Sequence, residues 1–567
     1  MRYSVLADTY EELESTTKKL EKSDIISKLL KKTPADVLEP VVLLLNGQVF
    51  PVWSAQEIGV AHQLIIKAIA KATGESPENI VKQYKKLGDL GLVADFFISK
   101  KKQRTLDSEE LTVKKVFKNL QEIAVHAGTG SQDKKLSLIA ELLSQASPKE
   151  ARYVVKTVLE ELRIGVAEGL IRDAIAKAFD ATAEEVEAAW SVLPDYGEIA
   201  TIAKEKGKKG LEKVELKFGV PIQVLLAEKV PTLKDAYDEF APHVIFEYKY
   251  DGMRGLLQKK GSKVWVFTRR MEDVTAAFPE VVEYVRKNVK ADNIVLDSEV
   301  LGISPKTGKP MPFQMLSTRI KRKYDIEKAT KEMPVQVNLF DIVYLNGKSL
   351  IDLPLRERRE ILAKNIHEVK GKFQRATFLI PKSFEETEKF YHESLDAGHE
   401  GLIAKNLEAK YVPGRRVAGG WLKIKPTLEN LDVVIVGGTW GSGKRAGTVG
   451  SLSLGIRDAD TGKFLECGML GTGLKEKKTE EGDVTLTDIT KMLRPLITWE
   501  EGHNIKIKPK VVIEVAYEEI QKSPTYESGF ALRFPRLIRL RLDKGPDEAD
   551  DTTRLKKIYD MQKGRAK

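Results

Sequence analysis

A lysine at position 249 lies between two carboxylates, Glu247 and Asp251, and is followed closely by a glycine and by Arg254. In a strand over residues 244–250, Glu247 and Lys249 would share one face, and three apolar or aromatic side chains would share the other. A lysine in a pocket can act as a nucleophile when burial or neighbouring cations lower its pKa toward neutrality. The segment therefore predicts a strand that carries a nucleophilic lysine, although Lys-x-Asp-Gly alone is also typical of a strand that ends in a turn.

The pattern Lys249-x-Asp251-Gly252-x-Arg254 resembles motif I of the covalent nucleotidyltransferases, which include ATP-dependent DNA ligases, RNA ligases and mRNA capping enzymes. Six further segments resemble the later motifs and follow in the same order: residues 267–270 (Ia), 296–299 (III), 339–342 (IIIa), 400–405 (IV), 421–425 (V) and 533–544 (VI). The RFPR form of motif VI is similar to that of cellular DNA ligases. The chain thus resembles the ATP-dependent DNA ligase family, and most closely its archaeal members.

This resemblance implies roles for the side chains around the lysine. Lys249 would attack ATP and form a lysine–AMP intermediate with loss of pyrophosphate. Glu247 would accept a hydrogen bond from the adenine amino group, and Phe340 would stack on the purine, although ordinary strand core is the alternative for Phe340. Arg254 and Arg269 would contact ribose or phosphate, where a guanidinium suits paired oxygens.

Two acidic residues, Glu299 and Glu400, resemble the metal ligands of the family, and Glu299 also resembles its ribose ligand. Two carboxylates suit a Mg²⁺ ion that keeps waters and binds phosphate oxygens. The remaining candidates are basic: Lys423 and Lys425 would hold the α-phosphate, Arg415 and Arg416 would flank the same pocket, and Arg533, Arg536 and Lys544 would orient the pyrophosphate. Arg539 and Arg541 compete for that last role.

The pattern of apolar and polar residues changes twice along the chain, which fits the three domains that a length of 567 residues predicts. Residues 1–215 read as almost entirely helical, with a capping box at Ser147 and Glu150, and the resemblance implies that they form a DNA-binding domain. Residues 216–426 alternate strand-like runs and amphipathic helices, an α/β or α+β pattern that the resemblance identifies as the nucleotidyltransferase (adenylation) domain. Residues 427–567 contain five short strand-like runs and a charged terminal helix, which predicts an OB-fold β-barrel.

Two glycine-containing segments invite a phosphate-binding interpretation. Residues 161–169 interrupt a helical pattern beside Arg163, and they resemble a signature of the helical DNA-binding domain; a tight corner between helices is the alternative. Residues 438–444 fit part of a P-loop, but Arg445 replaces the magnesium-binding hydroxyl, and a strand-like run follows where a helix is required. We therefore expect a loop that touches the DNA backbone in the second case.

Composition narrows the classes of function. A net charge of +10 and a pI of about 9.1 suit a polyanionic partner. The single cysteine, Cys467, excludes an internal disulfide and a cysteine-built zinc site, which disfavours an NAD-dependent bacterial ligase. No apolar stretch approaches the ~20 residues that a membrane span needs, so we expect a cytoplasmic, nucleoid-associated protein.

The resemblance implies an ATP-dependent DNA ligase that seals nicks in duplex DNA during replication, repair and recombination, with ATP and Mg²⁺ as cofactors. The alternatives are an RNA ligase, a GTP-dependent capping-type enzyme and a noncatalytic DNA-binding scaffold. A monomer is expected. Family members often dock on the sliding clamp through the N-terminal domain, and Gln103 and Leu106 lie where that motif would be, although its aromatic pair is missing.

Overall fold

The computed structural model describes residues 1–54, 56–101, 110–126, 130–320, 322, 324–414, 419–426, 428–441, 447–474 and 484–562. Its contacts divide the chain into two compact units, residues 1–381 with 403–423, and residues 382–402 with 424–567. No helix among these described residues is long and apolar enough to cross a membrane.

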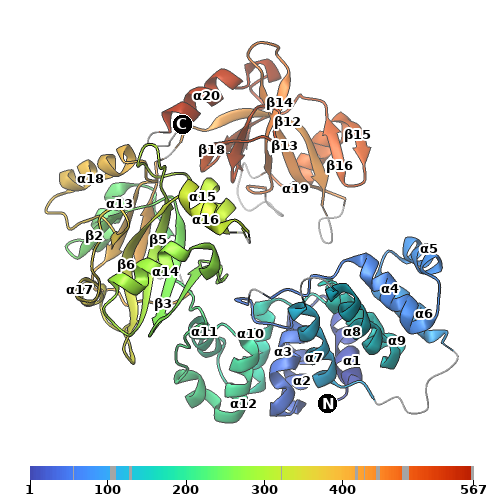
Figure 1. The fold of residues 1–567 in the computed structure, drawn as a ribbon. Helices are drawn as coiled ribbons and strands as arrows, with labels where there is room; N and C mark the ends of the chain where they lie inside the picture. Colours follow the sequence, from blue (N-terminus) through green and yellow to red (C-terminus); the bar gives the residue numbers. More distant parts are fainter. Residues whose placement is uncertain are drawn as a thin grey trace. The chain divides into compact units, whose positions relative to one another are not determined.

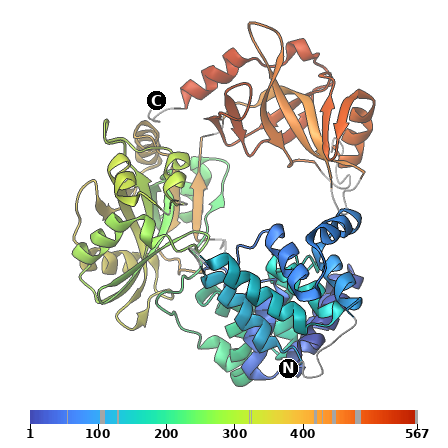
Figure 2. The ribbon, with the colours of Figure 1, turned by 45° about the vertical axis from the view of Figure 1, so that its right-hand side comes forward.

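The first unit begins with a helical region, shown in blue to teal in Figures 1 and 2. Its helices are α1 (Tyr3–Ser15), α2 (Lys19–Lys32), α3 (Ala35–Leu45), α4 (His62–Thr73), α5 (Pro77–Leu87), α6 (Leu90–Ser99), α7 (Val113–Val125), α8 (Ser131–Gln145), α9 (Pro148–Val158), α10 (Glu168–Ala178), α11 (Ala183–Val192) and α12 (Tyr196–Glu212). The helical N-terminal region predicted from the sequence is thus confirmed. The predicted capping box is present at the start of α9, where Ser147 and Glu150 bond each other's backbone amides.

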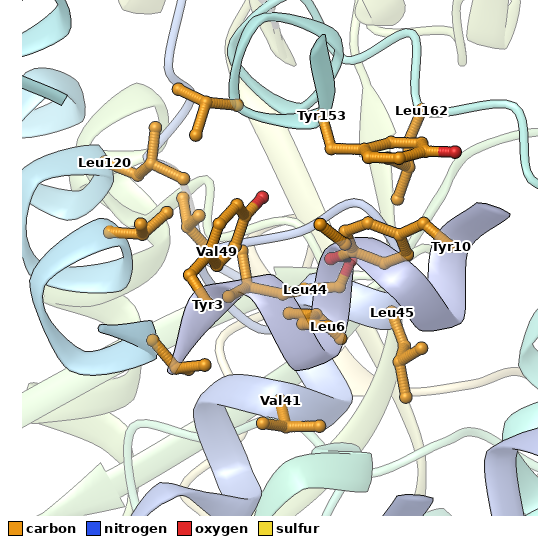
Figure 3. Close-up of a cluster of buried hydrophobic side chains, with 14 of the residues drawn as sticks. Tyr3, Leu6, Tyr10, Val41, Leu44, Leu45, Val49, Leu120, Tyr153 and Leu162 are labelled. Carbon is orange, nitrogen blue, oxygen red and sulfur yellow. Dashed lines mark hydrogen bonds between the residues drawn. The ribbon is translucent and has the colours of Figure 1, made fainter. Parts of the chain in front are cut away.

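One apolar core joins these helices (Figure 3). Tyr10 of α1 and Tyr153 of α9 lie with their ring centroids 5.0 Å apart. The Tyr10 hydroxyl donates to the carbonyl of Leu44 in α3 at 3.0 Å, so this buried polar group is satisfied. Because α1, α3 and α9 are distant in sequence, the core fixes the region as one body.

The rest of the first unit combines two sheets with helices. In chain order the elements are β1 (Glu228–Lys229), α13 (Leu233–Phe240), β2 (Val244–Tyr248), β3 (Met253–Lys260), β4 (Lys263–Thr268), α14 (Pro279–Asn288), β5 (Asn293–Gly302), α15 (Phe313–Ile320), α16 (Ile326–Glu332), β6 (Val335–Leu345), β7 (Lys348–Ser349), α17 (Leu355–Asn365), β8 (Phe373–Arg375), β9 (Phe378–Leu379), β10 (Leu402–Asn406) and β11 (Trp421–Ile424). The strand orders are β1-β11-β10-β2-β9 and β4-β3-β5-β6-β7, with β8 beside β6.

The six-stranded sheet separates two apolar clusters. On one side, side chains of α14, α15 and α17 pack against it, and α14 is seen alongside the sheet in Figure 1. The other cluster contains Leu256, Phe267 and Phe340 of this sheet together with Trp421 of the five-stranded one. The space between the two sheets is therefore partly aromatic, and the predicted site residues border it.

The second unit is rich in strands. Its elements are α18 (Phe384–Asp396), β12 (Leu431–Trp440), β13 (Val449–Arg457), β14 (Phe464–Leu470), α19 (Leu486–Leu493), β15 (Ile497–Glu501), β16 (Asn504–Ile507), β17 (Val512–Ala516), β18 (Glu519–Lys522), β19 (Phe530–Arg533), β20 (Arg536–Leu540) and α20 (Thr552–Met561). The main sheet runs β14-β13-β12-β16-β15, and β17 pairs with both β12 and β20. The described strands are OB-fold-like but do not pair into a closed barrel.

Several sequence predictions need correction here. The strand predicted over residues 244–250 ends at Tyr248, so Lys249 lies beyond it, and both of its faces are buried along residues 244–247. One of the five strand-like runs expected in residues 427–567, at residues 511–518, is longer than the strand it forms, since β17 ends at Ala516. The β15–β16 hairpin was missed, because four of the five residues of β15 are exposed and carry no apolar alternation. The strand that follows the P-loop-like segment is confirmed as β13.

Candidate active site

Lys249 lies in the short connection where the chain leaves β2 of one sheet and enters β3 of the other. This connection passes very close to β5. A Cβ atom at Gly252 would lie 2.5 Å from the carbonyl oxygen of Val300, so glycine is needed at that point. The proposed nucleophile is therefore held at the junction of the two sheets, next to the strand that carries Glu299.

Glu247, at 2% exposure, is the most enclosed of the predicted acidic site residues. Its carboxylate is held by two cations: Nη1 of Arg359 bonds Oε1, and Nζ of Lys405 lies 2.5 Å from Oε2. A buried carboxylate is tolerated only when such partners offset its lost hydration. The pairing therefore keeps Glu247 in one orientation beside the connection that holds Lys249.

Lys405 is itself buried between aromatic rings. Its ammonium lies 4.3 Å from the ring centroid of Phe340 and 4.0 Å from that of Trp421. Those two rings meet edge to face, 5.6 Å apart. Burial lowers the pKa of Lys405, although Glu247 opposes the shift. Phe340, the predicted purine-stacking residue, is thus part of an aromatic and cationic cluster with Glu247 at its edge.

Arg254 makes a paired contact with Asp297. Its Nε and Nη2 atoms lie 3.0 and 2.6 Å from the two carboxylate oxygens, and Nη1 donates to the carbonyl of Leu225 at 2.5 Å. Burial disfavours its charge, but Asp297 outweighs burial and raises the pKa of Arg254. Three of the five guanidinium N–H groups are therefore engaged within the protein, which leaves two for the ribose or phosphate contact expected of it.

A second buried pair lies on the neighbouring strand. Asp341 stands opposite Asp297 in the β5–β6 register, and Arg358 of α17 holds its oxygens at 2.8 and 3.0 Å. The side chains of both Arg358 and Asp341 are 0% exposed. The Tyr411 hydroxyl donates to Asp297 at 2.7 Å, and Arg358 lies over the Tyr411 ring. A continuous polar network thus supports the strands that carry Phe340 and Glu299.

The other predicted residues of the first unit lie near strand ends or edges. Glu299 is half-buried on β5, directly opposite Arg254 in the β3–β5 register. Arg269 follows β4 and is exposed. Lys423 is half-buried on β11. Asp297 and Glu299, two residues apart on β5, differ in burial, since Asp297 is fully buried and Glu299 is half-buried.

In the second unit, Lys425 lies 3.0 Å from Glu400 and 3.4 Å from Glu518. The residue after Glu400, Gly401, has a positive φ of 131°, and a Cβ atom there would lie 2.2 Å from the carbonyl oxygen of Ile424. The residue at this position must therefore be glycine, because the chain that carries Glu400 passes directly over the end of β11.

The basic residues of motif VI fall into two groups. Arg541 and Lys544 both bond Asp432 at 2.7 Å, and Arg539 bonds Glu514 at 2.7 Å. Arg533 and Arg536, by contrast, form no ion pair with any residue that the structure describes. The turn between them contains Phe534 at a positive φ of 50° with its ring 63% exposed. The structure thus shows which of the five basic residues are paired with carboxylates, which the sequence alone could not show.

In the helical region, residues 159–167 connect α9 to α10, and Arg163 projects from this connection with 79% of its side chain exposed. The buried Lys22 of α2 donates to the carbonyl of Ile164 and ties the connection to the bundle. A groove beside it is lined by Lys19, Lys22, Arg163, Gly165 and Arg172, among others. Both interpretations of this segment, a helix corner and a phosphate contact, are compatible with that geometry.

Some predictions fall outside the described residues. These are Arg415 and Arg416, the clamp segment between Gln103 and Leu106, and residues 442–446 of the P-loop-like segment. Conversely, reasoning from the sequence missed Arg358, Arg359, Lys405 and Tyr411. Two features of the sequence could have drawn attention to them: motif IV ends in Lys405, and Arg358 and Arg359 are adjacent in a helical segment. Neither feature indicates which carboxylate these side chains contact.

Models of known protein families match three segments of the chain. "DNA ligase N terminus" matches residues 2–176, "ATP dependent DNA ligase domain" residues 224–425, and "ATP dependent DNA ligase C terminal region" residues 445–544. A DNA ligase of Nanoarchaeum equitans (strain Kin4-M) is 47% identical over 564 residues, which cover 100% of this chain and 99% of that protein. A DNA ligase of Thermococcus onnurineus (strain NA1) is 44% identical over 562 residues, or 99% and 98% of the two chains.

A solved structure described as "Pmar-Lig_Pre." covers 95% of this chain and 99% of its own, with a TM-score of 0.55. At 16% identity it shows a similar fold and no more. The matched ligase domain of residues 224–425 contains Lys249, Glu247 and the network around them. The chain therefore belongs to the ATP-dependent DNA ligase family.

Proposed function

We propose that the protein is an ATP-dependent DNA ligase that seals nicks in duplex DNA. The observation that carries the proposal is the position of Lys249 beside a doubly ion-paired Glu247 and the aromatic pair of Phe340 and Trp421. It is strengthened by full-length identity of 40–47% to proteins named DNA ligase. Aromatic rings next to one fixed carboxylate suit a purine base, and a lysine two residues from that carboxylate suits attack on the phosphate attached to that base.

The reaction would proceed by three displacements at phosphorus. The neutral amine of Lys249 attacks the α-phosphorus of ATP, a P–N bond forms, pyrophosphate leaves and the nitrogen loses a proton. An oxygen of the 5′-phosphate at the nick then attacks the same phosphorus, the P–N bond breaks and the lysine regains a proton. Finally, the 3′-hydroxyl attacks the 5′-phosphorus, AMP leaves and the hydroxyl proton is released.

The residues of the chain would divide the binding of ATP among them. Glu247 would accept the adenine amino group while Phe340 covers the ring. Arg254 and Arg269 would contact ribose or phosphate, with Arg254 using the N–H groups that Asp297 and Leu225 leave open. Holding the reactants in one geometry lowers the barrier because their freedom is lost before the chemical step.

Charge on the phosphates needs both cations and metal. Lys423 and Lys425, with Arg415 and Arg416, would hold the α-phosphate. Glu299 and Glu400 fit Mg²⁺ because carboxylates are the hard oxygen ligands that this ion prefers and because two of them leave coordination positions open. When bound, Mg²⁺ would neutralise negative charge on the phosphates.

We assign three domains to these tasks: residues 1–215 bind DNA, residues 216–426 carry the nucleotide site, and residues 427–567 form an OB-fold domain. Arg533 and Arg536 would orient the leaving pyrophosphate, since the neighbouring Arg539, Arg541 and Lys544 are already held by carboxylates. Contacts to DNA would be mostly to phosphates, so binding should weaken steeply with salt and depend little on sequence.

Two further properties belong to this proposal. The enzyme would act as a monomer, and it would dock on a sliding clamp through the segment that contains Gln103 and Leu106. Co-elution of the protein with the cognate clamp at low salt, lost when Leu106 is replaced with alanine, tests the second point. Elution of the two proteins as separate peaks under those conditions would contradict it.

The nucleophile is tested by incubating wild type and Lys249→Ala with α-labelled ATP and Mg²⁺, followed by a chase with nicked duplex DNA. We expect covalent label on the wild type alone and its release from the protein as the nick closes. Label from GTP alone would favour a capping-type enzyme, and release by nicked RNA but not DNA an RNA ligase. A wild-type protein that takes no label would favour a noncatalytic DNA-binding protein.

A further inference from the structure

Helix α17 carries three arginines whose side chains have different surroundings. Arg356, with 47% of its side chain exposed, pairs with Glu408 at the surface. Arg358 is fully buried against Asp341. Arg359, 12% exposed, holds Glu247. Of the three, Arg359 is the one that contacts the residue expected to read the base, and neither the family motifs nor the comparisons assign it a role.

Two contacts fix the guanidinium of Arg359. Nη1 bonds Oε1 of Glu247, and the guanidinium carbon lies 4.5 Å from the ring centroid of Phe378. Phe378 of β9 is also the cross-strand neighbour of Glu247 in the β2–β9 register. The ring of Phe378 fixes the plane of the Arg359 guanidinium, and the guanidinium fixes the position of Oε1. The orientation of the whole Glu247 carboxylate is therefore fixed.

This arrangement limits which hydrogen bonds Glu247 can still accept. A carboxylate has about four acceptor positions on its two oxygens. Arg359 occupies one on Oε1 and Lys405 one on Oε2, so at most one position is left on each oxygen, in a carboxylate that cannot turn. The amino group of adenine donates a single hydrogen bond to one of them. Guanine instead presents two adjacent donors, N1–H and the 2-amino group, which a carboxylate accepts best with both oxygens at once, in the fork geometry that an arginine uses.

We propose that Arg359 is a positioning residue that makes the site select ATP over GTP. By occupying one acceptor position on Oε1 and fixing the plane of the carboxylate, it makes the paired contact that guanine needs less favourable than the single hydrogen bond from the adenine amino group. The inference rests on the proposed function, because it takes Glu247 as the residue that reads the base and Lys249 as the residue that accepts the nucleotide.

The experiment measures the initial rate of covalent labelling of the full chain with α-labelled ATP and with α-labelled GTP. The variants are Arg359→Met, Arg359→Lys and, as a matched control from the exposed part of the same helix, Arg356→Met. The quantity compared is the ratio of kcat/KM for ATP to that for GTP. Within one preparation, this ratio does not depend on the fraction of protein that is folded.

Arg359→Met should lower the ratio about tenfold or more, chiefly through a higher KM for ATP together with faster labelling by GTP. Arg359→Lys should restore part of the ratio, since an ammonium can still bond Oε1. Arg356→Met should leave it unchanged. If Arg359→Met does not fold, Phe378→Ala removes the ring that orients the guanidinium from a 41% exposed position, and it should lower the ratio in the same direction.

A ratio that stays within about twofold of wild type in Arg359→Met, while labelling by ATP persists, overturns the inference and leaves the proposed function standing. An equally large loss in Arg356→Met also overturns it, because the effect would then belong to the helix as a whole. Failure of the wild type to label with either nucleotide overturns the proposed function itself.

Discussion

Replacing Arg358 with methionine should destabilise the sheet that carries the nucleotide site. The side chain is fully buried and makes two bonds to Asp341, at 2.8 and 3.0 Å, and two more to the carbonyls of Leu353 and Ala409, at 2.5 and 3.1 Å. Its loss leaves the equally buried Asp341 carboxylate without a counter-charge. Breaking a buried pair in this way costs about 3–5 kcal/mol.

A second substitution separates the cost of the unpaired charge from the cost of lost packing. In the double variant Arg358→Met with Asp341→Leu, neither charge of this pair remains. The carbonyl of Leu353 is the main group that loses its donor, because the carbonyl of Ala409 still accepts from the Leu355 amide at 3.0 Å. We therefore expect the double variant to be more stable than Arg358→Met by about 2 kcal/mol or more. Arg356→Met, at the exposed position of the same helix, should change stability by no more than about 0.5 kcal/mol.

Native-state hydrogen exchange of the β6 amides is the appropriate assay, because a chain of several domains does not unfold in one step and local opening free energies avoid that difficulty. The reasoning fails if Arg358→Met lowers the opening free energy of β6 by less than about 1 kcal/mol, or if the double variant is the less stable of the two.

Three further predictions concern single side chains. Burial lowers the pKa of His399 to about 4, while an unfolded histidine titrates near 6.5. Between these pH values unfolding takes up a proton, so the free energy of unfolding should fall as the pH drops from about 6.5 to 4. Thermal unfolding of His399→Gln should lack this part of the pH dependence. Burial raises the pKa of Cys467 to about 12, so a thiol reagent at pH ~8 should modify it only after denaturation, and equal rates with and without denaturant would contradict this. Tyr411→Phe removes a 2.7 Å hydrogen bond to the buried Asp297 carboxylate and should lower the opening free energy of β5 by about 1.5–3 kcal/mol, again measured by hydrogen exchange; unchanged exchange would count against the bond.

The strands that the sequence predicted best are those with long apolar runs. The run at residues 335–345 is apolar or aromatic except at Gln336, Asn338 and Asp341, and β6 spans all of it. The strand that carries Glu247 was predicted too long. It ends early because the chain must pass close to β5 at Gly252, and a local sequence pattern cannot indicate a contact with a strand about 50 residues away. The exposed β15 was missed for the opposite reason, since it buries too little to leave a pattern.

The candidate site, too, could be predicted only in part. The spacing of the motifs could identify Glu247 and Phe340 as candidate site residues. It could not find that Arg359 and Lys405 hold Glu247, because those partners come from segments more than 100 residues further along the chain. A lone arginine in a helix is usually solvated, so only the folded arrangement identifies the one that reaches a buried carboxylate.

The two buried pairs, Arg254 with Asp297 and Arg358 with Asp341, also give the sheet a characteristic response to heating. The hydration of charged groups becomes less favourable as temperature rises, so the penalty for keeping these four groups out of water decreases. Stabilisation by apolar surface, in contrast, reaches a plateau. The strands behind the nucleotide site should therefore keep their alignment at high temperature better than an apolar core of equal size would.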